Sequence, residues 1–289
     1  MKQLVYFLVG LLIFSCKSTS KTDNRYQTKN YLEVAKILDA NPPDNFPLVI
    51  KLSVGKKQLI FIGTAHTRDI TKQADSIDYY FHQLQPQIAF NEGGQVDKEK
   101  HYNSRNEAIN QDAEIGQLKY LCDIQNIEMV NGDLVTAAEF NELFKIYSRE
   151  QVLLYTCCER FFALYKNNWI DTTKGIEAAY QKDFIQYLES ENVILTKSEK
   201  EFSYMTRAYK NFFGTDLDIY RIPTEKHDFL KDNGKLCEIG RSSKMVRDKY
   251  LLTTIEQALK KYDRIFVAFG GAHFVAVEPA LKQIMNKYK

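Results

Sequence analysis

Two histidines, His66 and His273, each end a Gly-x-x-His motif that follows a short apolar run, and Glu92 ends a third such run. Two imidazoles and one carboxylate form a donor set that suits a divalent transition metal ion with open positions for water and substrate. Such an ion polarises a carbonyl and activates water, and a carboxylate outside the ligand set can act as general base. The pattern therefore predicts a metal site with ligands His66, Glu92 and His273, in which Glu92 is also a candidate catalytic residue.

The three residues follow segments that the sequence predicts to be buried β-strands. The runs at 59–62, 87–91 and 264–269 are short and rich in β-branched and aromatic residues, which favours strands over helices. Gly63 and Gly270 end two of these runs and allow the backbone to turn sharply. In open α/β sheets, ligands bind outside the carboxyl ends of the strands. If the first and last of these strands are parallel neighbours, both histidines face the same crevice.

The remaining pattern predicts an α/β fold, with flanking helices around a mostly parallel central sheet. Further strands are expected over 48–54 and 128–130, and helices over 31–40, 71–84, 106–123, 241–260 and 277–288. From 148 to 213 the pattern is almost wholly helical, and aromatic residues at helical spacing are expected to pack these helices together: Trp169, Phe184, Tyr187, Phe202 and Tyr209. We expect a single domain over 28–289 with a helical insertion or cap at approximately 148–235.

Several other residues are candidates for the same site. Arg247, followed by Asp248, suits a bidentate clamp on an oxyanion or carboxylate. Asp133 is a further carboxylate at a strand end, where it would orient metal ligands. Residues that flank the two motifs are expected to contact substrate: Gly63, Thr64, Arg68, Gly270 and Gly271.

Each of these assignments has a structural alternative. Either histidine could be a turn residue that hydrogen-bonds to nearby backbone. Glu92 could cap a helix whose amino end favours negative charge. Arg247 could be a surface residue paired with Asp248. If the site is only structural, removing His66 would lower stability without affecting any ligand.

The amino terminus predicts export. Lys2 precedes an apolar segment at residues 4–14, which is too short to span a bilayer and suits a secretory signal. The sequence Ile-Phe-Ser-Cys resembles a bacterial lipobox, which implies cleavage before Cys16 and acylation of that cysteine, for example with palmitate. Residues 1–15 are then the signal peptide and 16–27 a polar tether, in a lipoprotein of the bacterial cell envelope. The alternative is an ordinary signal peptide with an incidental cysteine.

Composition excludes several classes of function. The formal net charge of the 289 residues is +2, so no basic excess indicates nucleic-acid binding. The chain has no Gly-x-Ser-x-Gly elbow, Walker loop or clear dinucleotide fingerprint. The cysteines beyond Cys16 lack metal-site spacing and are expected to be structural, with any disulfide pairing left open: Cys122, Cys157, Cys158 and Cys237.

The motifs at 61–66, 86–92 and 269–273, together with Arg247-Asp248, resemble the TraB/GumN/Tiki group. That group carries two Gly-x-x-His motifs with a glutamate between them. The resemblance covers roughly 59–92 and 240–274 and implies an α/β fold with its site at strand ends. For the Tiki members it implies a metal-dependent peptidase that uses manganese or cobalt. Related groups include erythromycin esterase-like hydrolases and the ChaN haem-binding lipoproteins.

We therefore expect a membrane-anchored, metal-dependent hydrolase that acts on a peptide or other acyl-linked substrate. Its cofactor would be manganese, cobalt or zinc, and Arg247 would stabilise developing negative charge. The alternative is a ChaN-like carrier of haem or another ligand, without turnover. The substrate, the metal and the oligomeric state do not follow from the residues.

Overall fold

The computed structural model describes residues 25–40, 46–65, 71–93 and 99–289. Cys16, His66 and Arg68, three of the residues expected at the anchor and the site, lie outside these ranges. No helix within them is long and apolar enough to cross a membrane.

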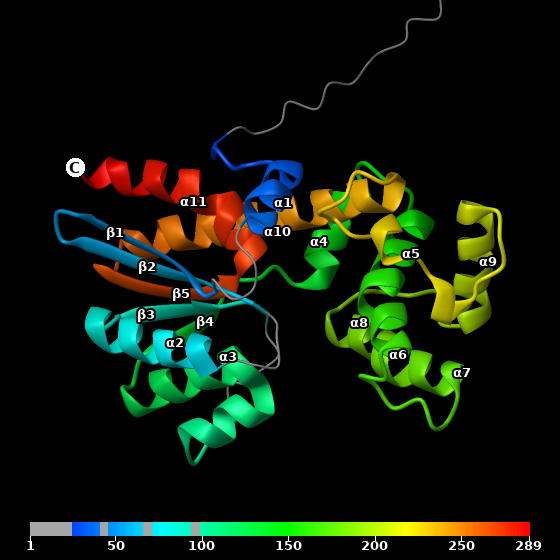
Figure 1. Ribbon diagram of the computed structural model, residues 1–289, viewed down its shortest axis with the longest axis horizontal. Coiled ribbons are helices and arrows are strands. Elements are labelled where there is room, and N and C mark those ends of the chain that lie inside the picture. Colours follow the sequence, from blue (N-terminus) through cyan, green and yellow to red (C-terminus); the bar gives the residue numbers. More distant parts are fainter. Residues whose placement is uncertain (1–24, 41–45, 66–70, 94–98) are drawn as a thin grey trace, which may run out of the picture.

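The described chain forms a five-stranded sheet of order β1-β2-β5-β3-β4 with helices on both faces (Figure 1). β1 (Leu48–Val54) pairs antiparallel with β2 (Lys57–Thr64) through a turn at Gly55, whose φ is +57°. The other strands are all parallel to β2: β5 (Arg264–Gly270), β3 (Ile88–Asn91) and β4 (Glu128–Asn131). The predicted α/β fold with a mostly parallel sheet is confirmed.

The last strand in the sequence, β5, lies between β2 and β3. Thr64 of β2 therefore pairs with Gly270 of β5, and Asn91 of β3 pairs with Ala268 of β5. β2 and β3 are parallel, as a β-α-β unit requires, but they are not neighbours. The carboxyl ends of all three strands meet at one edge of the sheet, which is where an open α/β sheet binds ligands.

Helices cover both faces of the sheet (Figure 1), and alternating side chains of the strands pack against different helix layers. Ile60, Ile62 and Phe266 face α2 (Thr71–Leu84) and α3 (Arg105–Ile124). Leu59, Phe61 and Val267 belong to the core under the opposite layer, which comprises α1 (Tyr31–Asp39), α10 (Lys235–Leu259) and α11 (Gly271–Met285). Because both faces are covered, the central strands are almost continuously apolar.

The helical part has a core of its own, to which α4 (Thr136–Leu143) also contributes. Phe140 of this helix is buried in the same cluster as Phe161 and Phe184. The other elements are α5 (Arg149–Cys157), the π-helix η2 (Cys158–Phe162), α6 (Ala163–Lys166), α7 (Ile176–Ala179), the π-helix η3 (Tyr180–Ile185), α8 (Gln186–Ser190), α9 (Phe202–Phe213), and the short 3-10 helices η4 (Ile219–Arg221) and η5 (Thr224–Lys226).

Trp169 was predicted to pack among these helices, and this prediction is wrong: the residue is 62% exposed. It follows the end of α6, where Asn168 adopts a positive φ of 55° that turns the chain away from the helix axis. The other predicted aromatic residues do pack there. Cys122, Cys157, Cys158 and Cys237 are buried free thiols.

Helix α10 connects the two cores. Its first turns place Leu236 and Ile239 in the core of the helical part, and its second half places Leu251 and Ile255 in the core of the sheet. The helix begins six residues before the predicted start at 241. Arg247 lies between these two halves, at the junction of the sheet edge and the helical part.

Candidate active site

Glu92 follows directly from the end of β3 and reaches across to β5. Its Oε2 atom accepts a hydrogen bond of 2.5 Å from the backbone N–H of Gly270. Gly270 is both the last residue of β5 and the N-cap of α11. Glu92 therefore lies at the amino end of a helix, where negative charge is favoured. Glu92 follows β3 at the edge formed by the carboxyl ends of the parallel strands.

His273 lies in the first turn of α11, because this helix begins at Gly271 and not near Val277 as predicted. Close packing accounts for the glycines at this junction. A Cβ at Gly63 would lie 2.8 Å from Cβ of Phe274, and a Cβ at Gly271 would overlap the ring of Phe46. Gly63 was expected to end its strand, but it lies within β2, which continues to Thr64. Its lack of a side chain lets α11 approach the sheet.

The imidazole of His273 is held by a buried carboxylate and a buried tyrosine. Its Nδ1 atom is 2.6 Å from Oδ1 of Asp248, and the Tyr31 hydroxyl donates to Oδ2 of Asp248 at 2.8 Å. Burial and the charge of Asp248 raise the pKa of Tyr31 well above its usual value, so the phenol stays protonated. An ionised carboxylate can only accept hydrogen bonds, so the proton of a neutral His273 resides on Nδ1.

The other ring nitrogen of His273 then has a free lone pair. Nε2 is buried and has no hydrogen-bond partner in the described part of the chain. Its distance to Oε1 of Glu92 is 3.7 Å, which is too long for a hydrogen bond. A buried acceptor nitrogen thus faces a carboxylate oxygen, and neither atom can donate a proton to the other.

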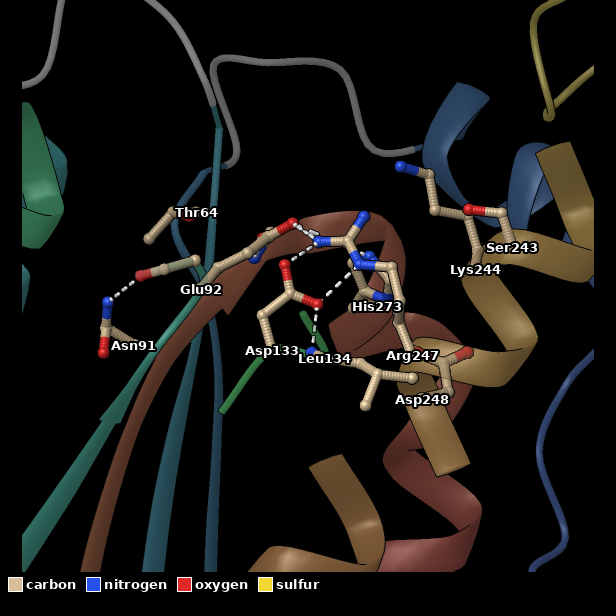
Figure 2. Close-up of polar contacts among 12 residues, drawn as sticks. Thr64, Asn91, Glu92, Asp133, Leu134, Ser243, Lys244, Arg247, Asp248 and His273 are labelled. Atoms are coloured by element: carbon tan, nitrogen blue, oxygen red, sulfur yellow. Dashed lines mark hydrogen bonds and ion pairs between the residues drawn. The ribbon is translucent and has the colours of Figure 1, made fainter. Parts of the chain in front are cut away.

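Arg247 contacts two carboxylates from different strand ends. Its Nε and Nη2 atoms each lie 2.6 Å from an oxygen of Asp133, and Nη2 lies 2.8 Å from Oε1 of Glu92 (Figure 2). The side chain is buried, with 3% exposure. Burial by itself lowers the pKa of Arg247, but the charges of Asp133 and Glu92 outweigh that effect and hold it well above its usual value.

Three carboxylates, those of Glu92, Asp133 and Asp248, and the guanidinium of Arg247 lie around His273.

A neighbouring, partly exposed cluster of charged residues joins α10 to α4 and η2. Lys244 pairs with Glu159 at 3.0 Å, and the hydroxyl of Ser243 donates to Glu139 at 2.6 Å. Burial by itself raises the pKa of Glu159, but Lys244 and Arg160 beside it lower that pKa to about 2. With Arg160 included, this cluster holds two cations and two carboxylates.

Thr64 lies on the other side of the sheet edge. It is buried, and its hydroxyl donates to Glu114 of α3 at 3.4 Å. Just before Glu114, helix α3 breaks at Asp112 and Ala113, and Ala113 has a positive φ of 49°. This break lies within the uninterrupted helix predicted for 106–123. Positive φ at a residue other than glycine is strained, and such strain is common near functional sites.

The structure brings together Glu92, Arg247 and His273 of the expected site. Asp133, expected as an orienting carboxylate, joins them through Arg247. Asp248 and Tyr31 were not predicted as site residues, although Asp248 adjoins Arg247 in the sequence. Tyr31 carries no recognisable motif. In the described ranges, no three His, Cys, Asp or Glu side chains are arranged to hold a metal ion; the expected third ligand, His66, follows Ala65 just outside them.

Comparisons with known proteins give no relative. No protein-family model, no curated protein and no solved structure matches this chain.

Proposed function

We propose that this chain is a metal-dependent hydrolase that acts on a peptide or other acyl-linked substrate. The observation that carries the proposal is the buried Nε2 atom of His273, which has a free lone pair directed at Glu92. Metal-binding histidines usually donate their second ring N–H to a carboxylate or carbonyl, which fixes the tautomer and orients the ring. Asp248 has that relationship to His273.

The donor set fits a divalent cation. One imidazole nitrogen and one carboxylate oxygen, joined by the expected ligand His66, suit manganese, cobalt or zinc. The carboxylates of Glu92, Asp133 and Asp248 lie around His273 and would attract such a cation.

A bound divalent ion would polarise a carbonyl group and lower the pKa of water. The protein's own residues then have distinct roles. Asp248 keeps the proton of His273 on Nδ1, so that Nε2 remains a ligand atom. Arg247 uses Nε and Nη2 to hold Asp133 and Glu92. We therefore assign Arg247 a positioning role. The sequence had suggested that it contacts developing negative charge directly. Gly270 fixes the second oxygen of Glu92.

Metal content, measured by mass spectrometry on protein purified without chelator, tests the proposal. Protein supplied with manganese, cobalt or zinc should retain about one ion per chain, and His273→Gln and His66→Gln should each lose it while staying folded. His101→Gln is the matched control, since the side chain of His101 is 69% exposed. A folded wild type that retains no metal, or a His273→Gln variant that retains it, would refute the site. Haem titration, read as a Soret band, would then test the carrier alternative.

We also propose that the chain is a lipoprotein anchored in the bacterial envelope through Cys16. The support is the resemblance of residues 13–16 to a lipobox and the polar stretch that follows. Labelling of growing cells with an alkyne analogue of palmitate should mark the wild type and leave Cys16→Ser unmarked. Equal labelling of both would contradict acylation at this residue.

A further inference from the structure

The residues that precede the sheet are fastened to the helix that carries His273. The backbone N–H of Lys29 donates to the carbonyl of Ala276 at 3.0 Å, and its ammonium donates to the carbonyl of Val275 at 3.3 Å. The same ammonium pairs with Glu278 at 3.2 Å. These contacts join the N-terminal segment to α11 within two turns of His273, and part of the expected tether, residues 25–27, is included in the packed structure.

Tyr31, the first residue of α1, extends from this segment into the site. Its side chain is 1% exposed and packs edge-on against Phe229, with ring centroids 5.4 Å apart. Its hydroxyl donates to Oδ2 of Asp248, whereas Oδ1 of the same carboxylate lies against Nδ1 of His273. Both oxygens of Asp248 are thus occupied, and the carboxylate is held from two directions.

We propose that Tyr31 is a positioning residue of the active site, and that the N-terminal segment it belongs to is part of the catalytic unit. This inference rests on the proposed function, in which His273 is a metal ligand. Without the hydroxyl, Nδ1 of His273 loses its own contact of 3.1 Å with that oxygen. Asp248 then keeps His273 as its one side-chain partner among the described residues and can rotate about its own side-chain bonds. The His273 ring would then lose the fixed orientation that directs Nε2 toward Glu92. Loss of such an outer contact typically weakens metal binding by about 10- to 100-fold.

Tyr26 provides a matched control in the same segment. Its hydroxyl donates to Oε2 of Glu256 at 2.8 Å, so it also bonds a carboxylate of α10. Glu256 is eight residues beyond Asp248, which is about 12 Å further along a helix. Tyr26→Phe therefore removes the same type of hydrogen bond from the same segment without touching His273 or Asp248.

The experiment compares the intact wild type, Tyr31→Phe and Tyr26→Phe by calorimetric titration of the metal-free protein with manganese. Tyr31→Phe should raise the dissociation constant by about 10- to 100-fold, and Tyr26→Phe should leave it unchanged. Melting temperatures of the metal-free proteins separate this effect from a loss of stability. A folded Tyr31→Phe variant that binds manganese as tightly as the wild type would overturn the role of Tyr31 alone. A wild type that binds no manganese, cobalt or zinc would overturn the metal site and this role together.

A second measurement does not depend on metal. The ¹⁵N signals of the His273 ring in the metal-free protein report which nitrogen carries the proton. The wild type and Tyr26→Phe should show the neutral ring protonated on Nδ1, and Tyr31→Phe should show a mixture of tautomers. Identical signals in all three proteins, together with equal metal affinity, would leave Tyr31 with a packing role only.

Discussion

His273 and Asp248 lie on different helices, and the Nδ1 atom of the histidine is 2.6 Å from an oxygen of the carboxylate. This contact joins the first turn of α11 to the middle of α10. It also determines which side of the imidazole is free, because the other nitrogen then points to Glu92 across the end of β5. The chemistry that we propose depends on this one orientation.

Replacement of Asp248 should weaken metal binding to a degree that depends on the replacement. Asp248→Asn keeps an oxygen that can accept from Nδ1 but loses the charge, so manganese affinity should fall about 10-fold. Asp248→Ala removes both contacts, and affinity should fall about 100-fold. Calorimetric titration measures both values. Unchanged affinity in a folded Asp248→Ala variant would contradict the orienting role.

Replacement of Arg247 should lower stability strongly. Arg247→Met removes the buried guanidinium that pairs with both Glu92 and Asp133, and breaking a buried ion pair costs about 3–5 kcal/mol. Urea unfolding of the metal-free protein gives the change in free energy. Lys210→Met is the control, since Lys210 and its partner Asp216 are 61% and 85% exposed and should show no measurable change. Equal unfolding midpoints for Arg247→Met and the wild type would refute the prediction.

Acid should destabilise the protein partly through Glu159. Its folded-state pKa is about 2, below the ordinary value of 4.5, so Glu159 contributes stability above pH 4.5 that is lost as the pH falls toward 2. Between those values the unfolded chain binds the proton more readily than the folded chain. Unfolding midpoints measured at several pH values from 6 to 3 should therefore fall less steeply for Glu159→Gln than for the wild type. Glu142→Gln, whose side chain is 51% exposed, should follow the wild type; parallel slopes for all three proteins would contradict the assignment.

Gly63→Ala should disturb the contact between β2 and α11. The added methyl group would lie 2.8 Å from Cβ of Phe274, which is next to His273 and cannot move without its helix. Overpacking of this kind costs about 1–3 kcal/mol, and manganese affinity should fall as well. At Gly132 the nearest atom to an added Cβ is Cδ1 at the end of the Leu251 side chain, at 2.9 Å, and not a Cβ atom fixed to a helix, so Gly132→Ala should cost less. Equal unfolding midpoints for the two variants would show that α11 adapts.

Local patterns predicted the strands and most helices. Strands that are buried on both faces appear as short apolar runs, and amphipathic helices appear as apolar residues at helical spacing. Helix α2 has the predicted bounds of 71–84. The position of β5 between β2 and β3 has no such trace, since pairing between strands 200 residues apart depends on the whole sheet. The early start of α11 was missed because Gly270-Gly271 reads locally as a turn, whereas tight packing on Phe46 requires the absence of a side chain at Gly271.

The candidate site was predictable where residues follow strands. Glu92, Asp133 and His273 were identified in this way, and Arg247 was identified through the resemblance. The sequence suggests Asp248 only as a partner of the adjacent Arg247. Its contact with His273 of α11 depends on how α10 and α11 pack, which the local sequence of α10 does not reveal. Tyr31 was predicted to begin a helix but not to belong to the site. At the start of a short amphipathic helix, the sequence does not distinguish a tyrosine that packs from a tyrosine that orients a carboxylate.

The contacts of Tyr31 join segments that lie far apart in the sequence. Asp248 is 217 residues and His273 is 242 residues further along the chain. During synthesis α1 leaves the ribosome long before α10 and α11, so these side chains can meet only after α11 has been made. Contacts of such large sequence separation form slowly. A chain that is cut short before α11 would lack His273, so under the proposed function metal uptake would report that α11 has been made and has folded against α1 and α10.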